Sequence, residues 1–498
     1  MSDKLEYLLD RLPDYLGGHM LISITALVVG LALSVPLGIA ASRRPKLAEW
    51  LLGIAGILQT VPTVALLAIM VPVMGGAIGF APAFVALMLY SILPILANTI
   101  TGLRGIDPVL NEAARGLGMT DWQMLTRVQL PLSAPVILSG IRTATVLVVG
   151  TATLATSVGG LSLGNYIFSG LEMNDMSWTI FGCVVAALLA ILLDQLVHVI
   201  EIAVGRRSKT LACVAGVGLC IVLVGGLYKP VARVFAPPVP VVASAPFTEQ
   251  HILSEVITQL MRDAGHPVDQ RQGMGETFQF IALKNNQIDC CINYTGNIWV
   301  TLMGQKGVAD AETTFQQTKT FLKEKYDVEC LGRLGFENAY VLAMKSDRAR
   351  KEGIASIGDL SKHPGKYVVG GDMQFAQRGE WDHVCKTYNL KFKEIKQMTP
   401  TLMYGAKDVD VLCAYLSDGR LTEHGYTTLA DPKKAFPPYD AIVLLSQKGA
   451  RNDALRLALE PLVNKIDLQA MRRANLRVDV EKQSPRTAAK ELLASLQR

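Results

Sequence analysis

The longest stretch of the chain without a charged residue runs from Leu51 to Leu103. A membrane-spanning helix needs only about 20 consecutive apolar residues, so this stretch is long enough for two spans. The GGAIGFAP segment at Gly75–Pro82 divides it, because glycine and proline interrupt regular helices. The first half of the chain is therefore predicted to be a membrane domain.

Four further apolar segments have the length of a membrane span. The first segment, Met20–Ala41, lacks a basic leader and is long enough to span a bilayer. This predicts a retained anchor and not a cleaved signal peptide. Together with the two spans of the charge-free stretch, they predict about six transmembrane helices. The four segments are Met20–Ala41, Leu132–Thr156, Met176–Ile202 and Thr210–Tyr228.

Charge sets the orientation of this domain and excludes some partners. Only 18% of the 498 residues are charged, and the formal net charge of +5 includes no dense basic tract, which argues against nucleic acid as a partner.

By the positive-inside rule, three basic loops are predicted to be cytoplasmic, so the N-terminus and everything after Tyr228 lie on the outer side. These loops contain Arg43, Arg44 and Lys46; Arg104, Arg115 and Arg127; and Arg206, Arg207 and Lys209.

Four ionisable residues lie within or near the predicted spans: Arg142, Asp194, His198 and Glu201. Charged groups are costly inside a bilayer and usually face the protein interior or reach the interface. Arg142 is therefore predicted either to snorkel to the interface or to face the protein interior.

After Tyr228 the sequence changes character. A short proline-bearing connector, Lys229–Pro240, is followed by apolar runs that alternate with amphipathic ones. This alternation predicts an α/β domain with largely parallel, buried strands, and about 260 residues suit two lobes. The predicted strands are VVASA, IDCCINY, AYVLAM, KYVVGG, VDVLCAY and YDAIVLL, and the predicted helices lie near 249–264, 311–325, 379–388 and 486–497.

Cysteine usage does not define a framework. Five of the eight cysteines lie in the second half, and an odd number in an outer-face domain argues against a complete set of disulfides. Cys290 and Cys291 are adjacent in a predicted strand and point to opposite faces. We interpret them as buried structural residues, and no His/Cys spacing indicates a metal site.

A polar stretch between the third and fourth spans has an informative spacing. Glu112-Ala113-Ala114 is followed after three residues by Gly118, and after nine more by Val128-Gln129-Leu130-Pro131. This resembles the EAA-x3-G-x9-I-x-LP coupling loop of ABC importer permeases, with Val for Ile. In that setting the two alanines keep one helix face slim, Gly118 permits a turn between two short helices, and Pro131 closes the second helix and begins the next span.

The resemblance extends over nearly the whole chain. The segments QTVPTVALLAIMVP, LPILANTITGL, LPLSAPVILSGIRTATVLVVGTATLA and GGLSLGNYI are similar to the glycine betaine/choline/carnitine permease subfamily. The segments FTEQHILSEV, INYTGNIW, YLSDGRL and FPPYDAIVLL are similar to its substrate-binding proteins. Fusion of the two parts in one chain also occurs in this family, including among relatives that import ergothioneine.

The resemblance implies a MetI-like ABC permease domain, all-α with about six transmembrane helices, followed by a two-lobed α/β periplasmic-binding-protein domain of type II. The expected divisions are a permease domain at 1–208, an extra membrane helix at 209–228, a linker at 229–238 and a binding domain at 239–498. The first lobe would comprise about 239–341 and 445–498, and the second about 342–444. The protein would be a multi-pass component of the cytoplasmic (inner) membrane, with the binding domain on the periplasmic or extracellular side.

No nucleotide-binding motif is recognisable. GxxxxGK[ST] does not occur, and Gly365-Lys366 is followed by tyrosine. The chain is therefore expected to be a transport subunit and not an enzyme, to carry no cofactor of its own, and to dock an ABC ATPase that binds ATP and Mg²⁺. The working unit in this family would contain two copies of this chain and two ATPase subunits. A membrane-anchored solute sensor is a distant alternative, but the cytoplasmic loops are too short for an output module.

The ligand-site prediction rests on four tyrosines. Tyr294, Tyr340, Tyr415 and Tyr439 match the aromatic-cage positions of the family, and several rings can hold a quaternary ammonium by cation–π attraction. The resemblance also implies that Gln250 and Asn297 hydrogen-bond a carboxylate and that Arg378 pairs with it. The family usually has threonine at Asn297, which leaves the ligand's identity open. A cage plus an arginine favours a zwitterion such as glycine betaine or carnitine, and ergothioneine or choline are the alternatives.

Overall fold

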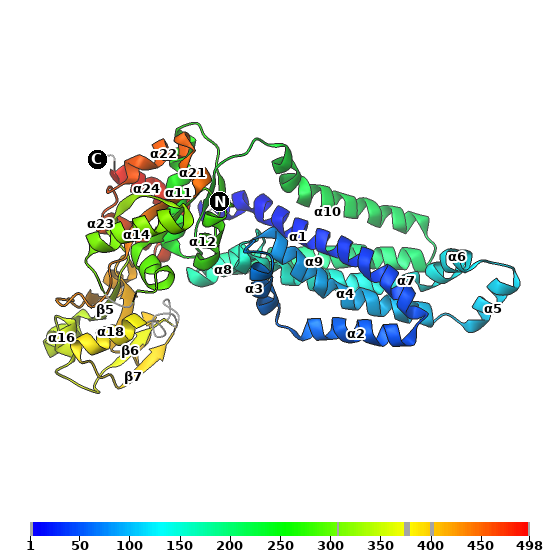
Figure 1. The fold of residues 1–498 in the computed structure, drawn as a ribbon, viewed down its shortest axis with the longest axis horizontal. Helices are drawn as coiled ribbons and strands as arrows, with labels where there is room; N and C mark the ends of the chain where they lie inside the picture. The colour runs from blue at the N-terminus through cyan, green and yellow to red at the C-terminus, as the bar shows by residue number, and fades with distance from the viewer. Residues whose placement is uncertain (1–2, 306–307, 373–378, 399–402, 497–498) are drawn as a thin grey trace. The chain divides into compact units, whose positions relative to one another are not determined.

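The structure is a computed structural model that describes residues 3–305, 308–372, 379–398 and 403–496. The chain divides into two compact units. One is a helical unit formed by Leu8–Phe168 and Ser177–Pro238, and the other is an α/β unit formed by Met1–Tyr7, Ser169–Met176 and Val239–Arg498 (Figure 1).

The helical unit is built from long apolar helices joined by short turns. Helix α4 packs along α7, and α2 and α3 both pack against α4. The short helices α5 and α6 lie together at one end of the bundle (Figure 1). The helices are α1 Asp3–Ser42, α2 Pro45–Thr60, α3 Thr63–Val73, α4 Phe80–Arg104, α5 Pro108–Gly116, α6 Asp121–Met124, the π-helix η1 Leu125–Gln129, α7 Leu130–Thr151, the 3₁₀ helix η2 Ala152–Val158, α8 Gly164–Glu172, α9 Met176–Gly205 and α10 Lys209–Phe235.

Among the described residues, five helices are long and apolar enough to cross a membrane, or six if the bent pair α2–α3 counts as one span. This agrees with the predicted number, and the break between the spans of the charge-free stretch lies where the glycines predicted it. The second span differs from the prediction. It consists of two helices that meet at 100°, with the break at Val61 and Pro62, where proline disfavours helical backbone in the preceding residue.

Two boundaries differ from the sequence prediction. Helix α10 continues to Phe235, so most of the predicted connector Lys229–Pro240 is helical, with Pro230 inside the helix. Pro131 does not close a helix. It lies directly after the π-helix η1, at the second residue of α7, and α6, η1, α7 and η2 form one continuous helix from Asp121 to Val158.

The α/β unit contains two five-stranded sheets. The first has the order β2-β1-β3-β10-β4 and the second has the order β7-β6-β8-β5-β9. All six predicted strands are present. The strands are β1 Val241–Ala243, β2 Asp269–Arg271, β3 Cys290–Tyr294, β4 Glu329–Glu337, β5 Tyr340–Lys345, β6 Val368–Gly371, β7 Glu394–Gln397, β8 Val411–Tyr415, β9 Tyr426–Thr428 and β10 Asp440–Leu445.

The sheets are mixed: in each, four of the five strands run in one direction, as the prediction of largely parallel strands expected, and one strand runs against them. Strand β10 is antiparallel to both β3 and β4, and β5 is antiparallel to both β8 and β9. These strands carry the chain from one sheet to the other and back. Apolar runs look alike in parallel and antiparallel strands when both faces are buried, which is why the sequence did not distinguish them. Strand β10 also lies wholly in the first sheet, although the predicted second lobe extended to residue 444.

The four predicted helices of this unit are confirmed as α11, α14, α18 and α24, within two residues at each end. The helical segments are α11 Thr248–Asp263, α12 Glu276–Lys284, α13 Thr295–Asn297, the π-helix η3 Ile298–Leu302, α14 Ala311–Tyr326, α15 Ser346–Glu352, α16 Ile357–Leu360, α18 Gly379–Tyr388, α20 Arg420–Glu423, α21 Gln447–Ala450, α22 Asp453–Leu459, the 3₁₀ helix η4 Glu460–Leu462, α23 Leu468–Asp479 and α24 Pro485–Leu496.

Candidate functional site

Three of the four predicted cage tyrosines lie against one another in the α/β unit. Tyr340 begins β5 and Tyr415 ends β8, and the antiparallel register places them directly opposite. Their ring centroids are 4.8 Å apart and their hydroxyl oxygens are 3.1 Å apart. The ring of Tyr439, which precedes β10 of the first sheet, meets Tyr340 edge-on at 5.9 Å. The cluster therefore combines rings from both sheets.

Tyr439 is held in place by a close backbone approach. Its ring lies so near Gly296 that a Cβ atom at that position would come within 2.6 Å of three ring carbons. Only glycine leaves that space. Gly296 belongs to the INYTG segment, and the sequence prediction did not assign it a role.

Two carboxylates that the sequence prediction missed brace these rings. The hydroxyl of Tyr415 donates to Asp372 Oδ2 at 3.0 Å, and the hydroxyl of Tyr439 donates to Glu380 Oε1. Both acidic side chains are buried. Burial, with Tyr340 and Asp372 nearby, raises the pKa of Tyr415 well above its ordinary value, so this hydroxyl stays a donor at neutral pH.

The positions of these acids follow from the topology. Asp372 directly follows β6, and β6 runs parallel to β8, so both strands end at the same edge of the sheet. A carboxylate directly after a buried strand is the signal that could have found Asp372. Glu380 lies in the first turn of α18, and no sequence pattern that we recognised indicates its contact with Tyr439.

Tyr294 has a different environment from the other three tyrosines. Its hydroxyl donates to Glu249 Oε1 at 2.5 Å and accepts from Gln250 Nε2 at 3.3 Å, while its ring stacks on Phe247 at 6.5 Å. Asn338 and Asn475 also donate to Glu249, each at 3.2 Å. Burial raises the pKa of Glu249 above its ordinary value. Tyr294 is thus part of a buried polar network.

Two of the three predicted carboxylate-binding residues are described, and each donates hydrogen bonds within the α/β unit. Gln250 is buried and donates to the backbone carbonyl of Ile292 at 3.2 Å as well as to Tyr294. Asn297 is half-buried and donates weakly to Glu276 Oε1 at 3.4 Å. Arg378 lies outside the described residues, so its role stays a prediction.

The SDGR segment contains a buried charge cluster. Arg420 makes paired contacts with Asp418, Nη2–Oδ2 at 2.7 Å and Nε–Oδ1 at 2.9 Å, and its guanidinium lies 5.1 Å from the centre of the Tyr404 ring. Asp479, at the end of α23, lies 3.9 Å from the same guanidinium and accepts from Thr248 at 2.5 Å. One cation thus faces two carboxylates, and burial raises the pKa of Asp479 to about 6.

The cysteines of the α/β unit are mostly buried thiols. Cys290 and Cys291 are fully buried within β3, and burial raises the pKa of Cys291 to about 12. A thiol with a raised pKa is a poor nucleophile and a poor metal ligand. In the part of the chain that the structure describes, no three His, Cys, Asp or Glu side chains are grouped so as to hold a metal ion.

The coupling-loop motif lies at the end of the helical unit. Gly118 follows α5 with a φ of +74°, and Thr120 then caps α6 in a capping box with Gln123. This is the predicted pair of short helices with a glycine turn. Of the motif alanines, Ala114 is buried and Ala113 is exposed. Leu130 packs partly against Leu103, Ile106 and Leu125.

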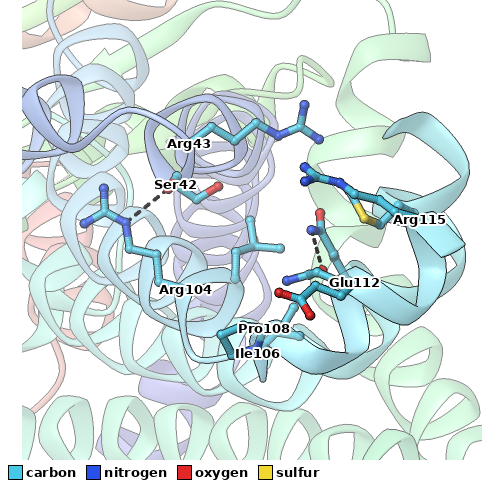
Figure 2. Close-up of a pocket in the computed structure, with 11 residues that line it drawn as sticks. Ser42, Arg43, Arg104, Ile106, Pro108, Glu112 and Arg115 are labelled. Atoms are coloured by element: carbon cyan, nitrogen blue, oxygen red, sulfur yellow. Dashed lines mark hydrogen bonds between the residues drawn. The ribbon is translucent and has the colours of Figure 1, made fainter. Parts of the chain in front are cut away.

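A cavity of about 400 Å³ opens beside this motif (Figure 2). Its wall includes Glu112 and Arg115 of α5, together with residues from the ends of α1 and α4. Gln129 donates to Asn111 at 3.0 Å across the cavity wall and so ties the π-helix to α5. Glu112 is exposed here.

The ionisable residues in the spans form one cluster between α7 and α9. Arg142 binds Asp194 through two hydrogen bonds of 2.6 and 2.8 Å and contacts His198 Nδ1 at 3.1 Å. His198 also contacts Glu201 at 3.2 Å. Arg142 therefore faces protein partners, which is one of the two predicted outcomes.

A helical membrane domain and a two-lobed α/β domain with a buried cluster of tyrosine rings, joined in one chain, are the architecture of a binding-protein-dependent importer subunit. The chain belongs to this transport family: residues 241–495 match the substrate-binding domain of ABC-type glycine betaine transport systems, and residues 34–210 match the binding-protein-dependent transport system inner membrane component. Membership implies a small solute as substrate and an ABC ATPase as partner.

Individual relatives resemble either the whole chain or its first half. The chain is 28% identical to the ergothioneine transport permease/ergothioneine binding protein EgtU of Helicobacter pylori (strain G27), over 94% of this chain and 87% of the relative. It is 44% identical to the glycine betaine/carnitine/choline transport system permease protein OpuCB of Bacillus subtilis (strain 168), over 37% of this chain and 84% of the relative. It is 41% identical to the osmoprotectant import permease protein OsmW of Salmonella typhimurium (strain LT2), over 40% of this chain and 96% of the relative.

Proposed function

We propose that this importer subunit captures a solute with a quaternary ammonium group and passes it to its own membrane domain. The observation that carries the proposal is the cluster of Tyr340, Tyr415 and Tyr439, with ring centroids 4.8 and 5.9 Å apart. A quaternary ammonium has no N–H to donate, so ring faces are its natural partners, at about 0.5–2 kcal/mol per ring.

The carboxylates behind the rings suit this ligand. Asp372 and Glu380 accept hydrogen bonds from the ring hydroxyls, which fixes the orientation of Tyr415 and Tyr439. Their negative charges also lie close to where a cation would be held. A preorganised cage loses less side-chain entropy when the ligand binds.

The substrate is proposed to be a zwitterion such as glycine betaine or carnitine. A carboxylated ligand would use Arg378, so Arg378→Ala should weaken binding of glycine betaine more than binding of choline. Ergothioneine is the second candidate, because a relative named for ergothioneine matches 94% of this chain. Ergothioneine carries the same trimethylammonium group with an aromatic ring attached.

The motor is proposed to be a separate ATPase that binds ATP and Mg²⁺. The working unit would contain two copies of this chain and two ATPase subunits in the cytoplasmic membrane, with the α/β unit on the outer side. Support comes from the coupling-loop motif and from the absence of a GxxxxGK[ST] motif in the sequence.

The test is uptake into proteoliposomes that contain the full chain and its ATPase subunit. We expect ATP-dependent uptake of one of glycine betaine, carnitine, choline and ergothioneine, and no uptake when the ATPase is omitted. Competition among the four solutes identifies the preferred one. Uptake that proceeds without any ATPase would contradict the proposal, as would a preference for solutes that lack a quaternary ammonium.

A further inference from the structure

The cavity beside the coupling loop has an unusual charge balance. Three arginines and one glutamate line it: Arg43, Arg104, Arg115 and Glu112. Arg104 already has partners, because its Nε and Nη2 donate to the backbone carbonyls of Ser42 and Ala41 at 3.2 and 3.1 Å. It therefore caps the C-terminal end of α1, where orphan carbonyls favour a cation.

Arg43 and Arg115 remain available. Both are exposed, and within the described part of the chain neither forms an ion pair. Figure 2 shows their guanidinium groups on the same side of the cavity. Two cations in a concave site focus a positive potential that attracts a carboxylate, and arginine can bind a carboxylate through two parallel hydrogen bonds.

Exposed apolar side chains lie on α5, on α6 and in the turn between them. Val109 is 65% exposed, Leu117 is 78% exposed and Trp122 is 72% exposed. They lie on either side of the Gly118 turn, so a partner that covers all three must contact both short helices. Tryptophan and arginine next to apolar contacts are the typical composition of an energetically important interface centre.

We infer that the Arg43/Arg115 cavity receives an acidic side chain of the ATPase subunit, which enters from the cytoplasmic side while Leu117 and Trp122 pack around it. This inference rests on the proposed function and adds the recognition chemistry of the partner. Glu112 lines the same cavity, and its negative charge disfavours a second acidic group next to it. The cavity therefore accepts a single carboxylate, beside the two arginines.

The experiment measures binding of the ATPase subunit that supports uptake to the full chain in nanodiscs. The test variant is Arg43→Glu/Arg115→Glu, and the matched control is Arg206→Glu, an exposed arginine outside the cavity. We expect the double variant to bind the ATPase at least tenfold more weakly and the control to bind like the parent chain. The single variants Arg43→Gln and Arg115→Gln should show smaller losses. An unchanged thermal unfolding transition of the helical unit shows that the variants fold, because solute affinity reports only on the α/β unit.

Two further arms separate the possible outcomes. The measurement is repeated in phosphatidylcholine nanodiscs with and without phosphatidylglycerol, and a loss seen only with phosphatidylglycerol would overturn the inference by assigning the arginines to lipid headgroups. Rescue of the double variant by a lysine at one acidic surface position of the ATPase would support it. Normal ATPase binding by the double variant, together with lost uptake in Gly118→Val, would reject this inference and leave the proposed function standing. Failure of the parent chain to respond to any ABC ATPase would reject the proposed function itself.

Discussion

The proposed ligand site and the proposed coupling site of this protein are built in opposite ways. At the ligand site the rings are buried, and the hydroxyls of Tyr415 and Tyr439 donate to buried carboxylates. At the coupling site Arg43 and Arg115 are exposed, beside exposed Leu117 and Trp122. The difference teaches how each site recognises its partner. In our proposal the first is preorganised for a small cation, and the second is completed by another subunit.

The largest expected effect is at the coupling site. Gly118 has a φ of +74° and open space around it, so Gly118→Val acts on the backbone alone, where a β-branched residue costs about 1–3 kcal/mol. We expect ATP-driven uptake to be lost while solute affinity is unchanged. The measurement is uptake in proteoliposomes beside calorimetry on the same protein.

Gly116→Ala is the matched control for this prediction. Gly116 ends α5 and also has open space around it, but its backbone is helical, which alanine adopts readily. Its uptake should stay close to that of the parent chain. Equal uptake by Gly118→Val and Gly116→Ala would show that the coupling site does not depend on this turn.

The ligand site should respond more strongly to the loss of a ring than to the loss of a hydroxyl. Tyr340→Ala and Tyr439→Ala each remove one ring face, worth about 2 kcal/mol or more in a desolvated site, and should weaken binding by about 30-fold or more. Tyr340→Phe and Tyr439→Phe keep the ring and should lose much less. Calorimetry on the full chain measures both effects. Alanine variants that bind like the parent chain would show that these rings do not hold the ligand.

Gly296→Ala tests the same cage without altering a cage residue. The added Cβ would displace the Tyr439 ring, from which it would lie only 2.6 Å. We expect solute binding to weaken while uptake per bound solute is kept. Unaltered affinity would mean that the position of Tyr439 does not matter for the ligand.

The buried cluster around Arg420 gives the α/β unit a predictable pH dependence. The pKa of Asp479 is raised from 3.8 to about 6 in the folded state, so the folded unit holds a proton that the unfolded chain releases. This stability is fully present below about pH 3.8 and is lost as pH rises through 6, by up to about 3 kcal/mol. Hydrogen exchange of α23 between pH 4.5 and 7.5 measures it. Asp479→Asn should flatten the profile, and a profile that persists in this variant would assign it to another group.

The smallest expected effect concerns the hydrogen bond from the Tyr439 hydroxyl to Glu380. Glu380→Gln keeps the shape and an acceptor for the Tyr439 hydroxyl but removes the charge, and a charged hydrogen bond is about 1 kcal/mol stronger than a neutral one. We expect about fivefold weaker binding of a quaternary ammonium. Glu324→Gln on the exposed face of α14 is the control and should bind normally. Equal affinities of the two variants would show that the charge of Glu380 does not contribute to ligand binding.

The sequence predicted those features that produce a pattern among residues close together in the chain. The charge-free run and the strand patterns predicted the spans and six strands, because burial imposes hydrophobic periodicity. The EAA spacing predicted the two short helices around Gly118. Contacts between residues far apart in the sequence produce no such pattern. The bend between α2 and α3, the antiparallel β10, the continuity of α6 with α7 through Pro131, and the Tyr439–Glu380 contact depend on tertiary packing that periodicity does not record.

The central claim is that the site recognises the positive charge of a quaternary ammonium and not merely its shape. Calorimetry on the full chain with two pairs of equal shape tests it most directly: glycine betaine against 3,3-dimethylbutanoate, and choline against 3,3-dimethylbutan-1-ol. Each pair exchanges the cationic nitrogen for a neutral carbon. We predict that the charged member of the preferred pair binds at least tenfold more tightly, because cation–π attraction needs the charge. Equal affinity of the two members would contradict the account.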